Sequence, residues 1–400
     1  MNVNQVSIKP RKARSPDKRA AHSAFSLINA RVVFPRAVEA TSVVVREGVI
    51  HRLDAIHGSA ARRIDCEGDY LLPGLVEIHT DNLERHVEPR PGTFWNTDRA
   101  VLSHDAELAT AGITTAFDAI MIGGDIGGRA REDSYLDAIG SIDRAEGQGL
   151  LRIEHHLHLR CELGSRHLVE NLRCASERRT PRLISVMEHV PGQGQWLDIE
   201  LFRQHYARRY SLTDSDLDAL IERRKADQAE FSAANRATIV ELARESGCIL
   251  ASHDDAETED VARAQLSNCT IAEFPTSLEA AREARRRGMY VIAGAPNLVR
   301  GSSHSGNVSA STLAEAGLVD ILSSDYLPSS LLHAVFCLTK LTGVPISTAV
   351  ATASMSAAQA LNLYDRGSIE EGKRADLIRV RDTPQGPVVV AAWCAGRQVA

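Results

Sequence analysis

The stretch "LPGLVEIHTDN", residues 72–82, places a histidine and an aspartate two residues apart directly after an apolar run. In a β-strand, residues i and i+2 point to the same face, so His79 and Asp81 can converge on one object. Imidazole and carboxylate groups are natural ligands of metal ions. The same letters also fit a strand that ends in a polar turn, with the aspartate serving only as a cap. The rest of the chain must decide between these two interpretations.

Apolar segments of strand length recur beyond this stretch and alternate with helical segments. The helical segments carry start and stop signals: Thr276 with Glu279 fits a capping box, Thr213 and Asp216 open a second helix, and Gly288 fits a helix end. Eight alternating strands favour a (β/α)8 TIM-like barrel, although an open doubly wound α/β sheet would accept the same alternation. The eight candidates are "LVEIH", "ITTAFDAI", "HHLHLRCEL", "LISVMEHV", "CILASHD", "IAEFPTS", "MYVIAGAP" and "VDILSSD".

The two ends of the chain share a different sequence pattern, which is typical of short β-strands. "FSLINARVVF" and "TSVVVREGVIHRLDAI" near the N-terminus, and "ADLIRVRD" and "GPVVVAAWCAGRQVA" near the C-terminus, are short runs with alternating apolar residues. This pattern predicts one small antiparallel sheet domain built from both termini. The expected domains are a disordered basic tail (1–22), the small sheet domain (23–72 plus 367–400) and the catalytic barrel (73–366).

Composition and charge are those of an ordinary globular enzyme. The 400 residues are 44% hydrophobic and 24% charged. A formal net charge of -6 and a pI near 6.2 give no overall attraction to nucleic acid or an anionic membrane. An anionic ligand must therefore be held by a local basic or metal site. Seven cysteines without a CxxC spacing argue against a disulfide framework and predict a cytoplasmic protein. The sequence leaves open whether the chain forms a homo-oligomer.

Titratable residues lie at or just after the ends of most of the predicted barrel strands. A single such residue is usually a cap, but the carboxyl ends of all eight strands of a barrel meet at one mouth, where the chemistry of this fold takes place. Mixed imidazole and carboxylate ligands suit zinc, manganese or iron better than calcium. A carboxylate such as Glu162 can bridge two ions. The residues are His79, Asp81, Asp118, Glu162, His189, His253 and Asp325.

"LPGLVEIHTD", the late strand-ending Asp325 and "GSIEEGKRADLIRV" (367–380) resemble the amidohydrolase superfamily over residues 25–400. The resemblance implies a barrel with one or two divalent metal ions per chain and a small β-sandwich made from both termini. It implies Asp325 as catalytic base, with His79, Asp81, Glu162, His189, His253 and Asp325 as metal ligands.

The sequence departs from the usual superfamily pattern in three ways. Most members carry His-x-His on the first strand, where this chain has His79-Thr80-Asp81. The common bridging lysine is not evident, so Glu162 would take its place. His189 and His253 fall on the fourth and fifth predicted strands rather than on the fifth and sixth.

Longer strings narrow the resemblance to amidohydrolases of phosphonate utilisation through the carbon–phosphorus lyase pathway. They are "EIHTDNLERH", "HLRCEL", "GAPNLVRGSSHSGNVSA" and "DILSSDYLPSSLLHA". The implied reaction is metal-dependent hydrolysis of α-D-ribose 1-methylphosphonate 5-triphosphate to the 5-phosphate plus pyrophosphate, with no nucleic-acid or membrane partner. Two alternatives stay open. A deaminase or deacetylase using the same metals predicts a neutral, apolar pocket, and a non-catalytic barrel scaffold would have no use for buried charges.

Candidate substrate contacts come from two loops. The segment 294–307, "GAPNLVRGSSHSGN", offers backbone N–H groups and an arginine that suit phosphate oxygens, although its spacing fits an ordinary barrel loop equally well. The implied triphosphate favours contacts through Arg300, Ser302, Ser303 and His304. The first barrel loop adds Asn82 and Arg90, with Arg85, His86 and Trp95 as further candidates. His156 and His158 share one strand face and are interpreted as structural.

Overall fold

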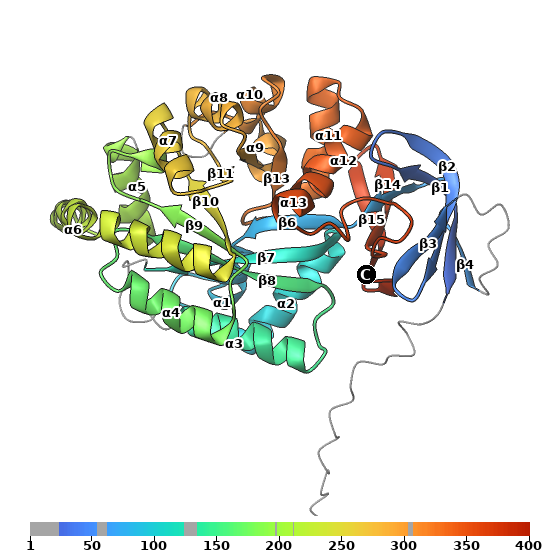
Figure 1. Cartoon of the computed structure of the whole chain (residues 1–400), viewed down its shortest axis with the longest axis horizontal. Coiled ribbons are helices and arrows are strands. Elements are labelled where there is room, and N and C mark those ends of the chain that lie inside the picture. Colours follow the sequence, from blue (N-terminus) through green and yellow to red (C-terminus); the bar gives the residue numbers. More distant parts are fainter. Residues whose placement is uncertain (1–23, 54–61, 124–133, 197, 211, 303–306) are drawn as a thin grey trace, which may run out of the picture.

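The computed structural model describes residues 24–400 except 54–61, 124–133, 197, 211 and 303–306 (Figure 1). The predicted tail at 1–22 therefore lies outside the described residues. The described strands form two sheets of eight strands each, one parallel and central, the other at one end of the molecule.

All eight predicted barrel strands are present, and they lie in sequence order around the parallel sheet. An isolated parallel bridge between Thr80 and Asp325 joins the first strand to the chain just after the last, so the sheet curls into a nearly closed barrel rather than an open one. The strands are β6 (Leu75–Thr80), β7 (Ile113–Ile122), β8 (Glu154–Glu162), β9 (Leu183–Met187), β10 (Ile249–His253), β11 (Ile271–Glu273), β12 (Tyr290–Gly294) and β13 (Ile321–Ser323).

The buried carboxylate of Glu77 ties β6 to β13. The Ser323 hydroxyl lies 2.6 Å from Glu77 Oε1, and the backbone N–H of Ser324 donates to Glu77 Oε2 at 2.6 Å. Glu77 also accepts from the backbone N–H of His79 at 2.8 Å. Burial raises the pKa of Glu77. This joint brings the residues after β6 and those after β13 to the same edge of the barrel.

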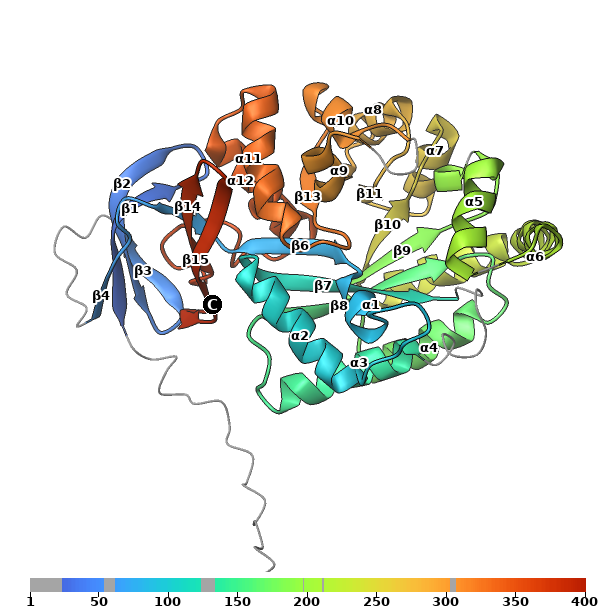
Figure 2. The same ribbon diagram turned by 180° about the vertical axis from the view of Figure 1, so that it is seen from behind.

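Helices cover the outside of the barrel, and shorter ones lie in the loops (Figure 2). The longest, α6, opens at Thr213 and Asp216 as predicted, and the two residues form a capping box. The helix ends at Gly247, whose φ of 68° suits a glycine. The predicted box at Thr276 is wrong, because Ser277 caps α8 by accepting from the backbone N–H of Ala280. The helices are α1 (Asn82–Val87), α2 (Thr97–Thr110), α3 (Ser134–Gly147), α4 (Leu168–Arg178), η2 (Gly194–Trp196), α5 (Ile199–Tyr210), α6 (Asp214–Ser246), α7 (Thr258–Leu266), α8 (Leu278–Arg286), α9 (Ala295–Arg300), α10 (Ala310–Glu315), α11 (Ser330–Thr342), α12 (Ile346–Thr352) and α13 (Met355–Ala360).

The second sheet is built from both termini, as predicted, and encloses its own core around Leu27, Val43 and Trp393. Strand β5 from the N-terminal part pairs antiparallel with β14 from the C-terminal part. The sheet is not wholly antiparallel, because β4 and β5 both run parallel to β1. Its strands are β1 (Phe25–Val33), β2 (Val38–Arg46), β3 (Val49–Leu53), β4 (Arg62–Asp65), β5 (Tyr70–Pro73), β14 (Leu377–Thr383), β15 (Gly386–Cys394) and β16 (Arg397–Gln398).

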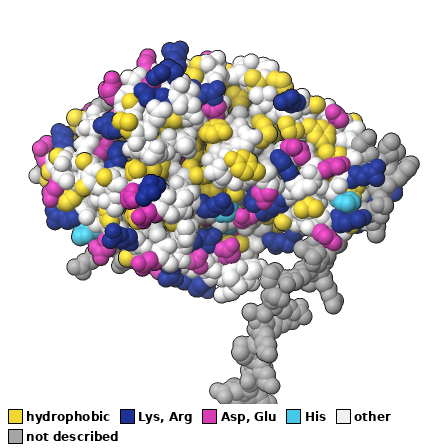
Figure 3. All heavy atoms as spheres, in the orientation of Figure 1, with side chains coloured by type: hydrophobic (Ala, Val, Ile, Leu, Met, Phe, Trp, Pro, Cys, Tyr) yellow, Lys and Arg dark blue, Asp and Glu magenta, His cyan; other side chains and the backbone are white. Residues whose placement is uncertain are grey.

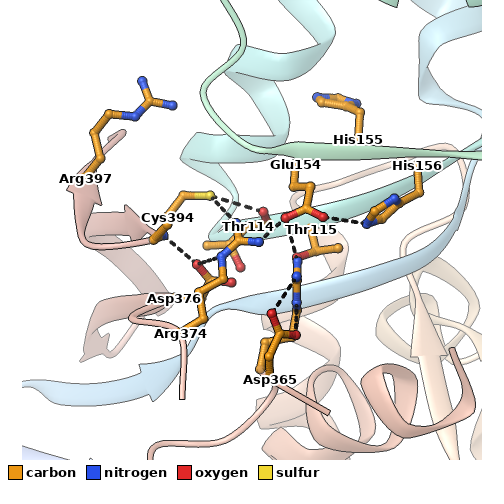
Figure 4. Close-up of polar contacts among 12 residues, drawn as sticks. Thr114, Thr115, Glu154, His155, His156, Asp365, Arg374, Asp376, Cys394 and Arg397 are labelled. Atoms are coloured by element: carbon orange, nitrogen blue, oxygen red, sulfur yellow. Dashed lines mark hydrogen bonds and ion pairs between the residues drawn. The ribbon is translucent and has the colours of Figure 1, made fainter. Parts of the chain in front are cut away.

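One carboxylate at the start of β8 joins the barrel to the segment that leads into the second sheet (Figure 4). Glu154 accepts from Arg366 Nη1 at 2.9 Å, pairs with Arg374, and lies 2.9 Å from His156 Nε2. Arg374 also reaches Asp376 at 3.0 Å. Arg366 also pairs with Asp365 at 2.9 Å. The side chains of Arg366 and Arg374 are only 6% and 16% exposed, and Glu154 is the carboxylate that both cations share.

Asp118 does not face the barrel mouth, and the sequence prediction that it does is wrong. It lies inside β7, four residues before the strand ends, and neighbouring side chains of a strand point to opposite faces. Phe117 packs in the barrel interior, so Asp118 points outward, where it contacts α2. There its two oxygens contact His104 Nε2 at 2.8 Å and His155 Nδ1 at 2.9 Å.

We predict that Glu154→Ala destabilises the protein by about 2 kcal/mol, because it removes the carboxylate that two largely buried guanidinium groups share and leaves each of them with one other carboxylate. The measurement is urea unfolding followed by circular dichroism. Glu370→Ala is the control, since the side chain of Glu370 is 49% exposed and its ion pair with Lys373 is a surface pair worth less than about 1 kcal/mol. Equal stability of the two variants would contradict the prediction.

A second prediction concerns the pH dependence of stability at His155. Burial opposes the charged imidazole, but Asp118 and Asp105 outweigh burial and raise the pKa of His155 to about 10. Because the pKa of a free histidine is about 6.5, this stabilisation is complete below about pH 6.5 and is lost as the pH rises toward 10.

The His155→Gln variant should therefore be less stable at pH 6 and lose less further stability than the wild type between pH 6.5 and 10. Thermal melts across that range measure the difference. His167→Gln, at a histidine that is 61% exposed, provides the control. Parallel stability curves for the wild type and His155→Gln would rule out this origin of the pH dependence.

Candidate active site

A cavity of about 390 Å³ lies at the carboxyl ends of the barrel strands. Five of the six predicted metal ligands line it, coming from the ends of β6 and β10 and from the turns after β6, β9 and β13. They are His79, Asp81, His189, His253 and Asp325. The strand count also stands: His189 follows the fourth barrel strand and His253 ends the fifth.

Glu273, at the end of the sixth barrel strand, holds two of the histidines and was missed by the sequence analysis. It is fully buried, with Oε1 at 3.2 Å from His79 Nδ1 and Oε2 at 3.0 Å from His253 Nδ1. The two imidazole rings stack with their centroids 5.3 Å apart. A carboxylate on Nδ1 orients the ring and leaves Nε2 as the metal-binding nitrogen. The signal in the sequence was the glutamate in "IAEFPTS", at the same strand-end position as the other site residues.

Glu162 has the same relation to His189 and does not line the cavity. Its Oε2 lies 2.8 Å from His189 Nδ1, and its Oε1 accepts from the backbone N–H of His189 at 3.1 Å. Burial opposes the charged imidazole, but Glu162 and Asp254 outweigh it and raise the pKa of His189 to about 9. Both oxygens of Glu162 therefore face His189 rather than the cavity, where the sequence analysis expected a bridging ligand.

Asp254 is a further cavity residue that the sequence analysis did not single out. Its Oδ2 lies 3.6 Å from His189 Nε2 and 3.5 Å from His253 Nε2, so the three groups surround one point. Asp254 and Asp325 both adopt left-handed backbone conformations, with φ of 56° and 53°. Such conformations cost energy in residues other than glycine and cluster at functional sites.

The donor set around the cavity fits a divalent metal ion. Nitrogen and carboxylate donors from several strands converge there, and two carboxylate oxygens, Asp81 Oδ1 and Asp254 Oδ2, are buried without a hydrogen-bond partner among the described residues. Burial lowers the pKa of His79, which keeps its ring neutral as a metal ligand requires. Burial and repulsion from Asp81 raise the pKa of Asp325 well above the usual range of a carboxyl group.

The predicted substrate contacts lie away from this cavity where the structure describes them. Asn82 is fully buried behind β6, where its Nδ2 contacts His104 Nδ1 and Glu107 Oε2, each at 3.1 Å. Arg90 is exposed in the loop after α1. Arg300 and Ser302 are exposed at the end of α9, and neither lines the cavity. Ser303 and His304 lie outside the described residues.

One side of the cavity comes from the helical segment between β9 and β10. Trp196, Tyr206 and Tyr210 supply aromatic surface, and Arg224 from α6 donates to the backbone carbonyl of His189 at 2.6 Å. Trp196 and Tyr206 pack with Leu217, Leu220 and other residues into a separate small hydrophobic cluster. The aromatic residues between 196 and 210 were the available sequence signal for this wall.

The surface carries no single-sign patch on the face seen in Figure 3, where basic and acidic side chains are interspersed. The binding of an anionic ligand therefore depends on the local groups of the cavity rather than on this face. Within the described ranges, no helix is both long and apolar enough to span a membrane.

Comparisons with known proteins agree with this architecture. Residues 205–399 match the model of the Amidohydrolase family. The chain is 42% identical to the α-D-ribose 1-methylphosphonate 5-triphosphate diphosphatase of Escherichia coli (strain K12), over 93% of this chain and 99% of that protein.

Solved structures share the fold at low identity. A 5-methylcytosine deaminase from Klebsiella pneumoniae is 15% identical with a TM-score of 0.62, covering 94% of this chain and 98% of its own. A dihydropyrimidinase from Brevibacillus agri NCHU1002 is 13% identical with a TM-score of 0.59, covering 94% of each chain. The barrel, the second sheet and the 42% identity together establish that this chain is an enzyme of the amidohydrolase family.

Proposed function

We propose that this enzyme hydrolyses a phosphoanhydride, converting α-D-ribose 1-methylphosphonate 5-triphosphate into the 5-phosphate and pyrophosphate in phosphonate catabolism. The main support is the 42% identity to a diphosphatase with that substrate in its name, which extends over nearly the whole chain. The cavity supports the same class of substrate, because the largely buried guanidinium group of Arg160 lines it beside the histidines and carboxylates. A wholly neutral substrate would bring no anionic partner to this cation.

The proposed metal ligands are His79, Asp81, His189, His253 and Asp325, with Glu162 holding His189 in place. A divalent ion bound there would neutralise phosphoryl oxygens and make a water molecule more acidic. Elemental analysis of the purified enzyme measures the number of ions per chain and identifies the metal.

The chain's own residues supply the remaining parts of the reaction. Asp325 accepts the proton of the attacking water, which its position in the cavity and its raised pKa favour. Glu273 fixes the rings of His79 and His253 so that their Nε2 atoms face the reacting group. Trp196 and Tyr206 give one side of the cavity a buried aromatic surface, which would reduce the access of water to a bound substrate.

The bond that breaks is the direct test of the proposed function. We expect hydrolysis of the ribose triphosphate between its first and second phosphoryl groups, with pyrophosphate released as one unit. Phosphorus NMR in water labelled with oxygen-18 measures the products and the phosphorus that gains the label. Release of orthophosphates one after another, or no hydrolysis of the triphosphate, would refute the proposed reaction.

Metal binding through Asp81 is the second test. Asp81→Ala should lower bound metal at least about tenfold and abolish activity, because it removes one negatively charged ligand. Asp81→His should keep some metal with a changed preference, since imidazole is the softer ligand. The measurement is elemental analysis after dialysis, with the fold checked by circular dichroism.

The matched control for this test is Asp382→Ala, at an exposed aspartate on β14. It should keep the metal content and the activity of the wild type. Metal content and turnover in Asp81→Ala equal to those of the control would show that Asp81 only caps the strand.

A further inference from the structure

Arg160 places a buried positive charge beside the proposed metal ligands. It lies on β8, the third barrel strand, two residues after the buried His158, so the two side chains share one face of the strand. Its side chain is 13% exposed and lines the cavity. Its Nη1 lies 3.3 Å from Asp81 Oδ2, and its Nε is buried without a hydrogen-bond partner among the described residues.

This arginine keeps most of its hydrogen-bonding capacity. A guanidinium group has five N–H donors in a planar fork, and the contact with Asp81 is a single, long one. Buried polar groups are normally satisfied, so the remaining donors require acceptor atoms that a ligand can bring. The fork matches two oxygens of one phosphoryl group.

Arg224, the other arginine of the described cavity lining, is already engaged. Its Nη1 donates to the carbonyl of His189 at 2.6 Å, and its guanidinium lies 5.5 Å from the ring centroid of Tyr206. It therefore belongs to the wall. Arg160, by contrast, contacts Asp81 and lines the same cavity as Asp325.

The acidic lining makes such a cation necessary for an anionic substrate. Asp81, Glu84, Asp254 and Asp325 all border the cavity, and each repels a phosphoryl oxygen unless a positive charge lies close by. Bound metal would offset part of this charge. Arg160 is a positive charge of the protein itself that offsets part of this negative charge, and it contacts one of the carboxylates, Asp81.

We propose that Arg160 binds the reacting phosphoryl group of the substrate and thereby selects anionic phosphoanhydrides over neutral substrates. The inference rests on the proposed function and deepens it. The sequence predicted the phosphate contact at Arg300, which is exposed and does not line the cavity. The structure favours Arg160 on the third barrel strand instead.

The test uses the metal-loaded enzyme as purified and a probe that cannot be cleaved, the α,β-methylene analogue of the ribose triphosphate. Calorimetry measures its dissociation constant, and steady-state kinetics on the true substrate measure kcat and KM. Arg160→Gln should weaken binding of the analogue about ten- to a hundredfold, the loss expected for one charge-assisted contact. Arg160→Lys should lie between Arg160→Gln and the wild type, because lysine keeps the charge but not the fork.

Two further measurements separate substrate binding from a structural role. Metal content should stay at the wild-type level in both Arg160 variants, since Arg160 is not a metal ligand. Arg282→Gln, at an exposed arginine of α8, should bind the analogue like the wild type.

Three results would overturn the inference. In the first, Arg160→Gln binds the analogue as tightly as the wild type. In the second, both Arg160 variants lose metal in proportion to affinity, so that Arg160 serves only Asp81. In the third, Arg300→Gln weakens binding while Arg160→Gln does not, which returns the contact to the seventh loop. A wild-type enzyme that does not bind the analogue would instead refute the proposed function, and this inference with it.

Discussion

The site depends on the buried carboxylate of Glu77, which connects the first barrel strand to the last. It bonds to the hydroxyl of Ser323 at the end of β13 and to the backbone N–H of Ser324 just after it. The backbone bridge between Thr80 and Asp325 adds a second connection beside it. Those two residues are 245 positions apart in the chain. Without this closure the sheet would be open, and Asp325 would not face His79 across one cavity. Closure of the barrel thus brings His79 and Asp325, which are far apart in the sequence, to the same cavity.

A second constraint acts at the mouth of the barrel, where carboxylates orient the histidine rings. The Glu273 carboxylate contacts the Nδ1 atoms of His79 and His253, and the Glu162 carboxylate contacts Nδ1 of His189. A free histidine rotates and exchanges its proton between two nitrogens, whereas a histidine with Nδ1 on a carboxylate presents Nε2 in one direction. Glu273 is buried where no water competes, so the arrangement exists before any ligand arrives.

Much of this architecture could be predicted from the sequence, because it depends on local patterns. The eight strands were recognisable from short apolar runs, and the cavity ligands from their place at the ends of those runs. What could not be predicted was the direction of side chains within a long strand and the partner of each acid. Asp118 looked like a residue at a strand end. It lies inside β7, which continues to Ile122, and its side chain points out of the barrel. Glu162 looked like a ligand, yet His189 takes both its oxygens.

The difference between a local sequence pattern and the direction of a side chain also separates the two sets of predicted residues. Most predicted metal ligands line the cavity, whereas the described predicted substrate contacts do not. The loop at 294–307 has a composition that suits phosphate, but composition does not say which way Arg300 points. Arg160 carried no such signal, because an arginine in a strand is usually at the surface. Only the closed barrel shows that its position faces inward among carboxylates. A buried cation with unused donors in an acidic cavity is a physical argument for an anionic substrate that is independent of any sequence likeness.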